Sequence, residues 1–296
     1  MNSYIERILS AKWYPSICKN PTEYKIIAKY LHPDVNNDPD AGTAFAHLNN
    51  LKKEYENGYE FQDESGVYIS NYQTHIWKGN ATLLQQSKEN YDFIIKKAKN
   101  TFDNRSYEHF MQYIPSNLNF DGDQLTYPSH YKCIPLSKVI KLLPENERNK
   151  HANWIYSRLI ELVSMFESLG ITHAGILPDS VFVIPEIHGI KVVSFYHVCE
   201  KKVTTINGKY KNYYPTQLFL SKEAGSYIDI NLIKKTAISI LGDISGAGTR
   251  LRANNNINTN VLDYLLLPET NAFHSLKKWR DILDANFIKE FVVLDI

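Results

Sequence analysis

The stretch ITHAGILPDSVFVIPEIHGIKVVSFY, residues 171–196, decides the fold. Its second part is rich in β-branched and aromatic residues and turns near His188-Gly189, which predicts a strand hairpin. The segment before it predicts a long helix that ends at Gly170, because apolar residues recur on one face. These are Trp154, Ile155, Leu159, Leu162, Val163, Phe166 and Leu169. We therefore expect a helix, a loop at 171–180 and a hairpin in succession.

The segments on either side of this stretch differ in character. GVYISNYQTHIW and ATLLQQSKENYDFIIKKAK, between residues 66 and 99, are rich in β-branched and aromatic residues, so we expect a meander of strands there. From about Pro144 the chain becomes mainly helical. Strands followed by helices predict an α+β domain over residues 61–296, with a small β lobe at 61–135 and a larger helical lobe at 136–296.

Composition excludes several classes of protein. With 43% hydrophobic and 22% charged residues in 296, the chain can bury a globular core, and its net charge of +1 gives no general attraction to nucleic acid. No apolar run is long enough to cross a bilayer, and the N-terminus does not resemble a signal peptide. Cys18, Cys133 and Cys199 lack metal-ligand spacing and indicate reduced thiols. We expect a cytoplasmic protein with no membrane, metal or nucleic-acid partner.

Residues 1–60 predict a separate helical hairpin. Asn20 and Pro21 are typical of a helix start, and the helix must end near His32 because Pro33 follows it. A second start signal at Asp38-Pro39 precedes apolar residues spaced three and four apart, and Asn57-Gly58 ends that helix. Two antiparallel helices would then place His32-Pro33-Asp34 at the tip.

This hairpin resembles the J-domain of DnaJ-type co-chaperones. The resemblance rests on the helix PTEYKIIAKYL with Lys25 and Lys29, the tripeptide His32-Pro33-Asp34, and Phe45 in the following helix. The family's short first helix with its Tyr-x-x-Leu-Gly pattern is replaced here by IERILSAKWYPSICKN, in which Ile5, Ile8 and Leu9 could still pack on the hairpin.

The resemblance implies a DnaK-type chaperone as the partner, docked on the tip and the basic face. Asp34 could accept charge-assisted hydrogen bonds, while Lys25 and Lys29 could steer the chain toward an acidic surface. The alternative is a hairpin that serves only for packing, with His32, Pro33 and Asp34 buried against the rest of the chain.

Residues 64–296 resemble the protein-kinase fold, with His173 at the first position of the catalytic loop His-Arg-Asp. The match then places Gly175 at the catalytic aspartate, Ser180 at the metal-binding asparagine, and Ser194 at the aspartate of Asp-Phe-Gly. Asp229 resembles the buried aspartate that anchors the catalytic-loop backbone. His173, His188 and His197 could suggest a metal, but no ligand spacing completes a site, so we interpret them as structural.

The resemblance also assigns a lysine and its partner in the small lobe. Phe93-Ile94-Ile95-Lys96 resembles the strand Val-Ala-Ile-Lys, so Lys96 would be the phosphate-contacting lysine and Glu108 its helix partner. NYQTHIWKG, residues 71–79, stands where a glycine-rich loop would be, without its glycines. Nucleotide binding without metal through Lys96 stays open, but an ordinary exposed strand lysine is the interpretation that we favour.

Without carboxylates at 175, 180 and 194, the resemblance implies a pseudokinase with no catalytic residues and no cofactor. We therefore expect a J-domain co-chaperone-like protein whose kinase-like domain binds a client or a regulator. A pseudokinase scaffold or inhibitor and an unconventional active phosphotransferase are the alternatives. The pairing of modules is similar to uncharacterised bacterial and bacteriophage proteins, which would place a phage product in host cytoplasm.

Overall fold

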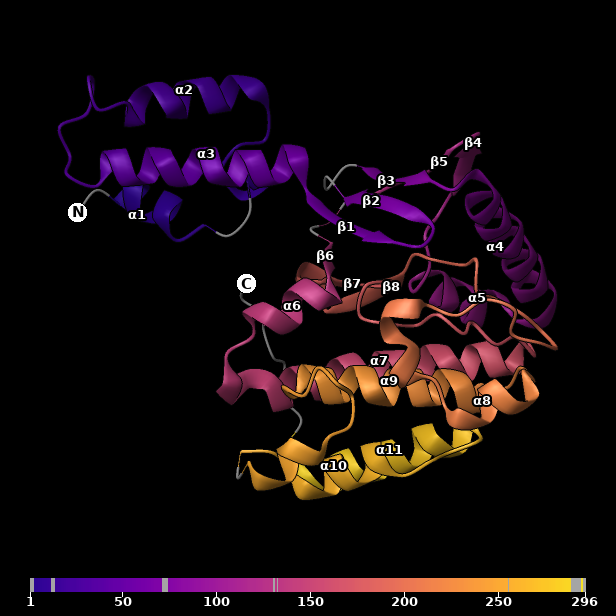
Figure 1. Cartoon of the computed structure of the whole chain (residues 1–296). Coiled ribbons are helices and arrows are strands. Elements are labelled where there is room, and N and C mark those ends of the chain that lie inside the picture. Colours follow the sequence, from indigo (N-terminus) through magenta and orange to yellow (C-terminus); the bar gives the residue numbers. More distant parts are fainter. Residues whose placement is uncertain are drawn as a thin grey trace.

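The computed structural model describes residues 3–11, 14–70, 74–129, 131, 133–254, 256–288 and 294. Three N-terminal helices, a sheet lobe and a helical lobe follow one another along the chain (Figure 1). Residues 71–73, at the start of the expected glycine-loop segment, lie outside the described residues.

The N-terminal unit has a hydrophobic core of its own. Its elements are α1 (Ser3–Leu9), the 3-10 helix η1 (Tyr14–Ser16), α2 (Pro21–Leu31) and α3 (Ala41–Asn57). Asn20 caps α2 by accepting two backbone N–H groups, and Gly58, with a φ of 65°, ends α3. Ile5 and Ile8 of α1 are fully buried against α2 and α3. Both predicted helices of the hairpin are therefore present, and α1 packs on them.

The sheet lobe is a five-stranded antiparallel sheet with the order β1-β2-β3-β5-β4. Its strands are β1 (Tyr59–Asp63), β2 (Gly66–Ser70), β3 (Thr74–Gly79), β4 (Asn119–Asp121) and β5 (Gln124–Pro128). Residues 74–79 form β3, so this part of the segment where we expected a loop is a strand, and a short turn at 63–66 joins β1 to β2. Turn-forming Asp63, Ser65 and Gly66 explain its position.

The strand predicted around Phe93–Lys96 is wrong, because this segment lies in helix α4 (Ala81–Thr101). Asn80 caps α4. The buried residues of this helix recur at intervals of three and four: Leu84, Ser87, Tyr91, Ile94 and Ala98. Lys96 is therefore an exposed helix residue rather than a strand lysine. Glu108, on α5 (Asn104–Met111), is also exposed.

The helical lobe begins with β6 (Ile134–Pro135), which pairs with the predicted hairpin of β7 (Val181–Ile184) and β8 (Gly189–Val192). The long helix α7 (Arg148–Ser168) packs on α9 (Ser226–Ile240) and α11 (Ala272–Asn286) (Figure 1). The remaining elements are α6 (Leu136–Leu142), η2 (Glu145–Glu147), η3 (Pro185–Ile187), η4 (Gly208–Tyr213), α8 (Thr216–Ser221), η5 (Thr249–Ala253) and α10 (Thr259–Leu266).

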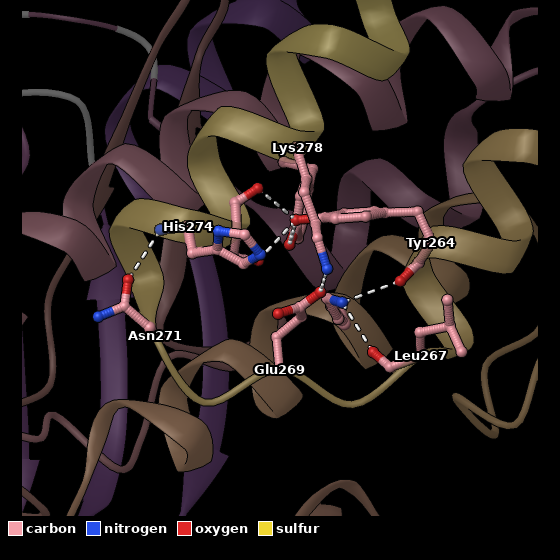
Figure 2. A network of polar contacts seen from close by, with 9 residues as sticks. Tyr264, Leu267, Glu269, Asn271, His274 and Lys278 are labelled. Atoms are coloured by element: carbon pink, nitrogen blue, oxygen red, sulfur yellow. Dashed lines mark hydrogen bonds and ion pairs between the residues drawn. The ribbon is translucent and has the colours of Figure 1, made fainter.

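A network of polar contacts lies at the end of α10 around Tyr264, Leu267 and Glu269 (Figure 2). A buried lysine of α9 takes part in it. Lys234 Nζ donates to the carbonyl oxygens of Tyr264 and Leu267, each at 2.8 Å, and lies 4.0 Å from the centre of the Tyr264 ring. Burial lowers the pKa of Lys234 to about 8. Glu269, paired with Lys278 at 2.7 Å, adds negative charge beside it. The network satisfies the last carbonyls of α10 and fixes the C-terminal helices.

None of the helices that the structure describes combines the length and apolar composition that a membrane span requires.

Candidate functional site

The tip of the hairpin is exposed. The side chains of His32 and Asp34 keep 47% and 85% of their accessible surface. Pro33, Lys25 and Lys29 are exposed as well. The tip is therefore not buried against residues 59–296, which is what the packing-only alternative required.

Local hydrogen bonds order the tip. The backbone N–H of Asp34 donates to His32 Nδ1 at 3.2 Å, and the His32 carbonyl accepts from Val35 and Asn36. The His32 ring meets the edge of Phe45 on α3, with centroids 6.0 Å apart. The imidazole and the carboxylate are thus held side by side at the end of a helical fork.

The loop at 171–180 is anchored from α9. Asp229, which is 1% exposed, accepts the backbone N–H groups of His173 and Ala174, both at 2.7 Å. The Tyr214 hydroxyl donates to the Ala174 carbonyl at 2.8 Å. Ala174 has a φ of 55°, a conformation that alanine rarely adopts, so these contacts hold a strained backbone.

Gly175 leaves no room for a side chain. A Cβ atom there would lie 2.5 Å from Cδ2 of His197 and 3.3 Å from its Cβ. The His197 ring is held by a 3.2 Å contact between Nδ1 and the Thr205 carbonyl, and it packs on Tyr196. A carboxylate at 175 would therefore require His197 to leave its place.

Ser180 and Ser194 have structural surroundings. The Ser180 hydroxyl donates to the Gly175 carbonyl at 2.5 Å and accepts from the Leu177 N–H at 2.9 Å, so it braces the loop. Ser194 is 2% exposed, and its hydroxyl has no hydrogen-bond partner within the described part of the chain. The next residue, Phe195, is fixed to α4 because its N–H donates to Ser87 and its carbonyl accepts from Asn90.

Aromatic side chains fill the space between β2, β3, β5 and β7. The His75 ring stacks on Tyr127 with centroids 4.4 Å apart, and Phe182 contacts Tyr68 at 4.8 Å. The Tyr68 hydroxyl bridges His75 Nδ1 at 2.5 Å and the Tyr127 hydroxyl at 2.7 Å. All four side chains are buried.

The β1–β2 turn carries two acids across to the helical lobe. Glu64 Oε1 accepts the backbone N–H of Gly208 at 2.6 Å. The Tyr196 hydroxyl lies 3.4 Å from an oxygen of both Asp63 and Glu64. Burial raises the pKa of Asp63, and the charge of Glu64 adds to the rise. This acidic turn ties the sheet lobe to the segment that follows residue 194.

Several sequence-predicted residues thus lie together, and two do not. His173, Gly175 and Ser180 lie on one loop, and Asp229 anchors it. Ser194 follows β8 next to Val193, whose N–H donates to the Ser180 carbonyl at 3.0 Å. Lys96 and Glu108 lie exposed on α4 and α5, outside this cluster. Sequence reasoning missed the aromatic cluster and the acidic turn, and it named His197 as a structural histidine without placing it beside Gly175. Of these, only the turn had a local signal, in Asp63, Ser65 and Gly66.

Among the described residues, no three His, Cys, Asp or Glu side chains gather as metal ligands would.

No family model and no curated protein matches the sequence. Among solved structures, the chain is similar to vaccinia related kinase 3, with a TM-score of 0.51 at 10% identity, over 77% of this chain and 92% of that chain. The chain has a protein-kinase-like fold. Its sheet lobe and helical lobe are those of that fold.

Two structures from Toxoplasma gondii are also similar. One is a rhoptry antigen kinase domain, with a TM-score of 0.48 at 12% identity, over 76% of this chain and 78% of that one. The other is ROP2, described as a virulence factor with a protein-kinase fold and no enzymatic activity, with a TM-score of 0.47 at 13% identity, over 78% and 79%.

Buried histidines predict that acid destabilises the kinase-like fold. Burial lowers the pKa of His75 and His173 to about 3 and of His197 to about 4, so all three are neutral in the native state. Unfolding raises each pKa to about 6.5, so unfolding takes up protons below that pH, at about 2 kcal/mol per histidine at pH 5. Burial raises the pKa of Asp229 to about 7, so this group binds a proton more tightly in the folded state and adds stability as the pH falls. We expect a net loss of about 3 kcal/mol between pH 7.5 and 5.

Urea unfolding at a series of pH values measures this loss. Replacing His75 with Gln should reduce the number of protons taken up on unfolding by about one below pH 6.5, so the unfolding free energy should depend less steeply on pH. An unfolding free energy that rises steadily from pH 7.5 to pH 5 would contradict the neutral buried histidines.

Proposed function

We propose that this chain is a J-domain co-chaperone-like protein, whose His32-Pro33-Asp34 tip engages a DnaK-type chaperone and whose kinase-like domain binds a client or regulator without transferring phosphate. The exposed tip at the end of a helical fork with its own core is the observation that carries the proposal. Lys25 and Lys29 extend the same surface along α2 with positive charge.

The tip has the chemistry that such docking needs. Asp34 can accept bidentate, charge-assisted hydrogen bonds from a partner arginine, and the neighbouring lysines can speed association with an acidic surface. His32 and Pro33 limit the conformations of the loop, which lowers the entropy lost on binding. A hairpin with only a packing role would have no need to expose these groups.

The kinase-like domain has lost the groups that phosphoryl transfer needs. That reaction uses a carboxylate near the acceptor hydroxyl, side chains that hold magnesium, and a flexible glycine loop over the phosphates. Here Gly175 faces His197, Ser180 braces its own loop, and two carboxylates occupy the β1–β2 turn. These acids would repel the phosphates of a nucleotide. An unconventional phosphotransferase would need another base and another lysine, since Lys96 lies exposed on α4, outside the cluster around the loop at 171–180.

Binding to a purified DnaK-type chaperone tests the proposal. Asp34→Asn should weaken binding at least about tenfold, because it removes a charge-assisted hydrogen-bond acceptor. Surface plasmon resonance with immobilised full-length chain measures the affinity. Asp121→Asn, a matched change of an exposed acid on β4, should bind as the wild type does.

Equal affinity for the wild type and Asp34→Asn, or no binding of either, would contradict the proposal.

A further inference from the structure

A surface cavity of about 450 Å³ lies where α5, α7 and the β7–β8 turn meet. None of its lining residues belongs to the N-terminal helical hairpin or to the loop at 171–180. Its walls come from the end of α5, from one face of α7, from β8 and from the segment before β6. They comprise Gln112, Tyr113, Tyr131, Arg158, Ile187, His188, Gly189, Ile190 and Lys191.

The charged side chains in these walls are all of one sign. Arg158 and Lys191 are cationic, and the described lining contains no carboxylate. The larger cavity beside α6 differs, because Glu60 and Asp179 offset its lysines. A cavity lined by cations and by hydroxyl and amide groups selects an anion.

Neighbouring groups hold both cations in place. Lys191 Nζ donates to the Ile114 carbonyl at 2.9 Å, which uses one of its three N–H groups. Arg158 Nη1 lies 3.5 Å from Glu161 Oε2, and its side chain is 43% exposed. Glu161 is already engaged by the Tyr113 hydroxyl at 2.6 Å and by His109 at 3.2 Å. Glu161 therefore holds the guanidinium of Arg158 in place and offsets part of its charge, while Lys191 has no carboxylate among the described walls of the cavity.

The walls also offer an apolar surface next to the cations. Ile187 is 49% exposed and Tyr131 is 40% exposed at the rim, and the His188 ring lies against Trp154 with centroids 4.0 Å apart. His188 has a φ of 51°, which turns the chain tightly at the edge of the cavity. Such a surface suits the organic part of a ligand, while the cations take its charged group.

We propose that this cavity binds a phosphate monoester, with Arg158 and Lys191 as its charged contacts. A phosphate monoester carries nearly two negative charges at neutral pH and three acceptor oxygens, which match two cations better than a carboxylate does. The site is separate from the hairpin tip, so it goes beyond the proposed chaperone interaction and does not depend on it.

Isothermal titration of the full chain with phenyl phosphate tests the site. We expect saturable binding that weakens with added salt and that falls about tenfold in Arg158→Gln, whose exposed side chain can change without unfolding the protein. Lys191→Gln should have a similar effect. Lys141→Gln, in the cavity beside α6, should bind as the wild type does.

Two further ligands define the specificity. Benzoate, with one negative charge, should bind at least about tenfold more weakly than phenyl phosphate. Inorganic phosphate should compete with phenyl phosphate but bind more weakly, because it makes no contact with the apolar rim. The absence of saturable phenyl phosphate binding, equal binding by Arg158→Gln, or equal binding of benzoate would overturn the proposal.

Discussion

Gly175→Asp is expected to lower the free energy of unfolding by at least about 3 kcal/mol and to produce no phosphoryl transfer. The new Cβ would lie 2.5 Å from Cδ2 of His197, and the carboxylate would enter a fully buried loop. Overpacking and an unpaired buried charge both add to this loss. Urea unfolding measures the stability, and transfer from labelled ATP measures the activity.

A double-mutant cycle tests whether the side chain of His197 causes the steric part of this loss, without introducing a charge. Gly175→Ala adds only a methyl group and should cost about 2 kcal/mol in the wild type, but less than about 0.5 kcal/mol in a His197→Ala background, where the space is free. A neutral Gly175→Ala, or an equal cost in both backgrounds, would show that His197 does not block this position. Transfer of phosphate by Gly175→Asp would contradict the predicted loss of catalysis.

Asp229→Asn is expected to cost about 3 kcal/mol of unfolding free energy. The two oxygens of Asp229 accept the N–H groups of His173 and Ala174, and an asparagine could accept only one of them. Its amide group would face the second N–H, which would stay buried without a partner. Denaturant unfolding checks the loss, and faster hydrogen exchange of the two amides would locate it.

Asp263→Asn is the matched control. Asp263 lies on α10, is 47% exposed and pairs with Arg252 at 3.0 Å, so its replacement should change stability by no more than about 0.5 kcal/mol. If the two substitutions cost the same, the loop does not depend on its anchor in α9.

Much of the fold could be predicted because the sequence marks both the ends and the apolar faces of several helices. Asn20, Pro21 and Gly58 mark the ends of the hairpin helices, and the apolar face before Gly170 marks α7. Helix α4 was missed because Phe93-Ile94-Ile95 has β-branched character, although buried residues from Leu84 to Ala98 follow a helical period.

The candidate site could be predicted only in part, because much of it is assembled from distant residues. His197 fills the space beside Gly175 from 22 positions further along the chain, and no local pattern announces that contact. The aromatic cluster draws Tyr68, His75, Tyr127 and Phe182 from four strands. Such contacts follow from tertiary packing, whereas the tip of the hairpin is contiguous in sequence and was visible there.

The most direct test of the account is single-turnover hydrolysis of labelled ATP by a DnaK-type chaperone, measured with no addition, with the full-length chain, and with its His32→Gln variant. The account predicts that the wild type accelerates hydrolysis at least about tenfold, that His32→Gln does not, and that the chain alone hydrolyses no ATP. Equal rates with the two forms, no acceleration by the wild type, or turnover by the chain alone would contradict it.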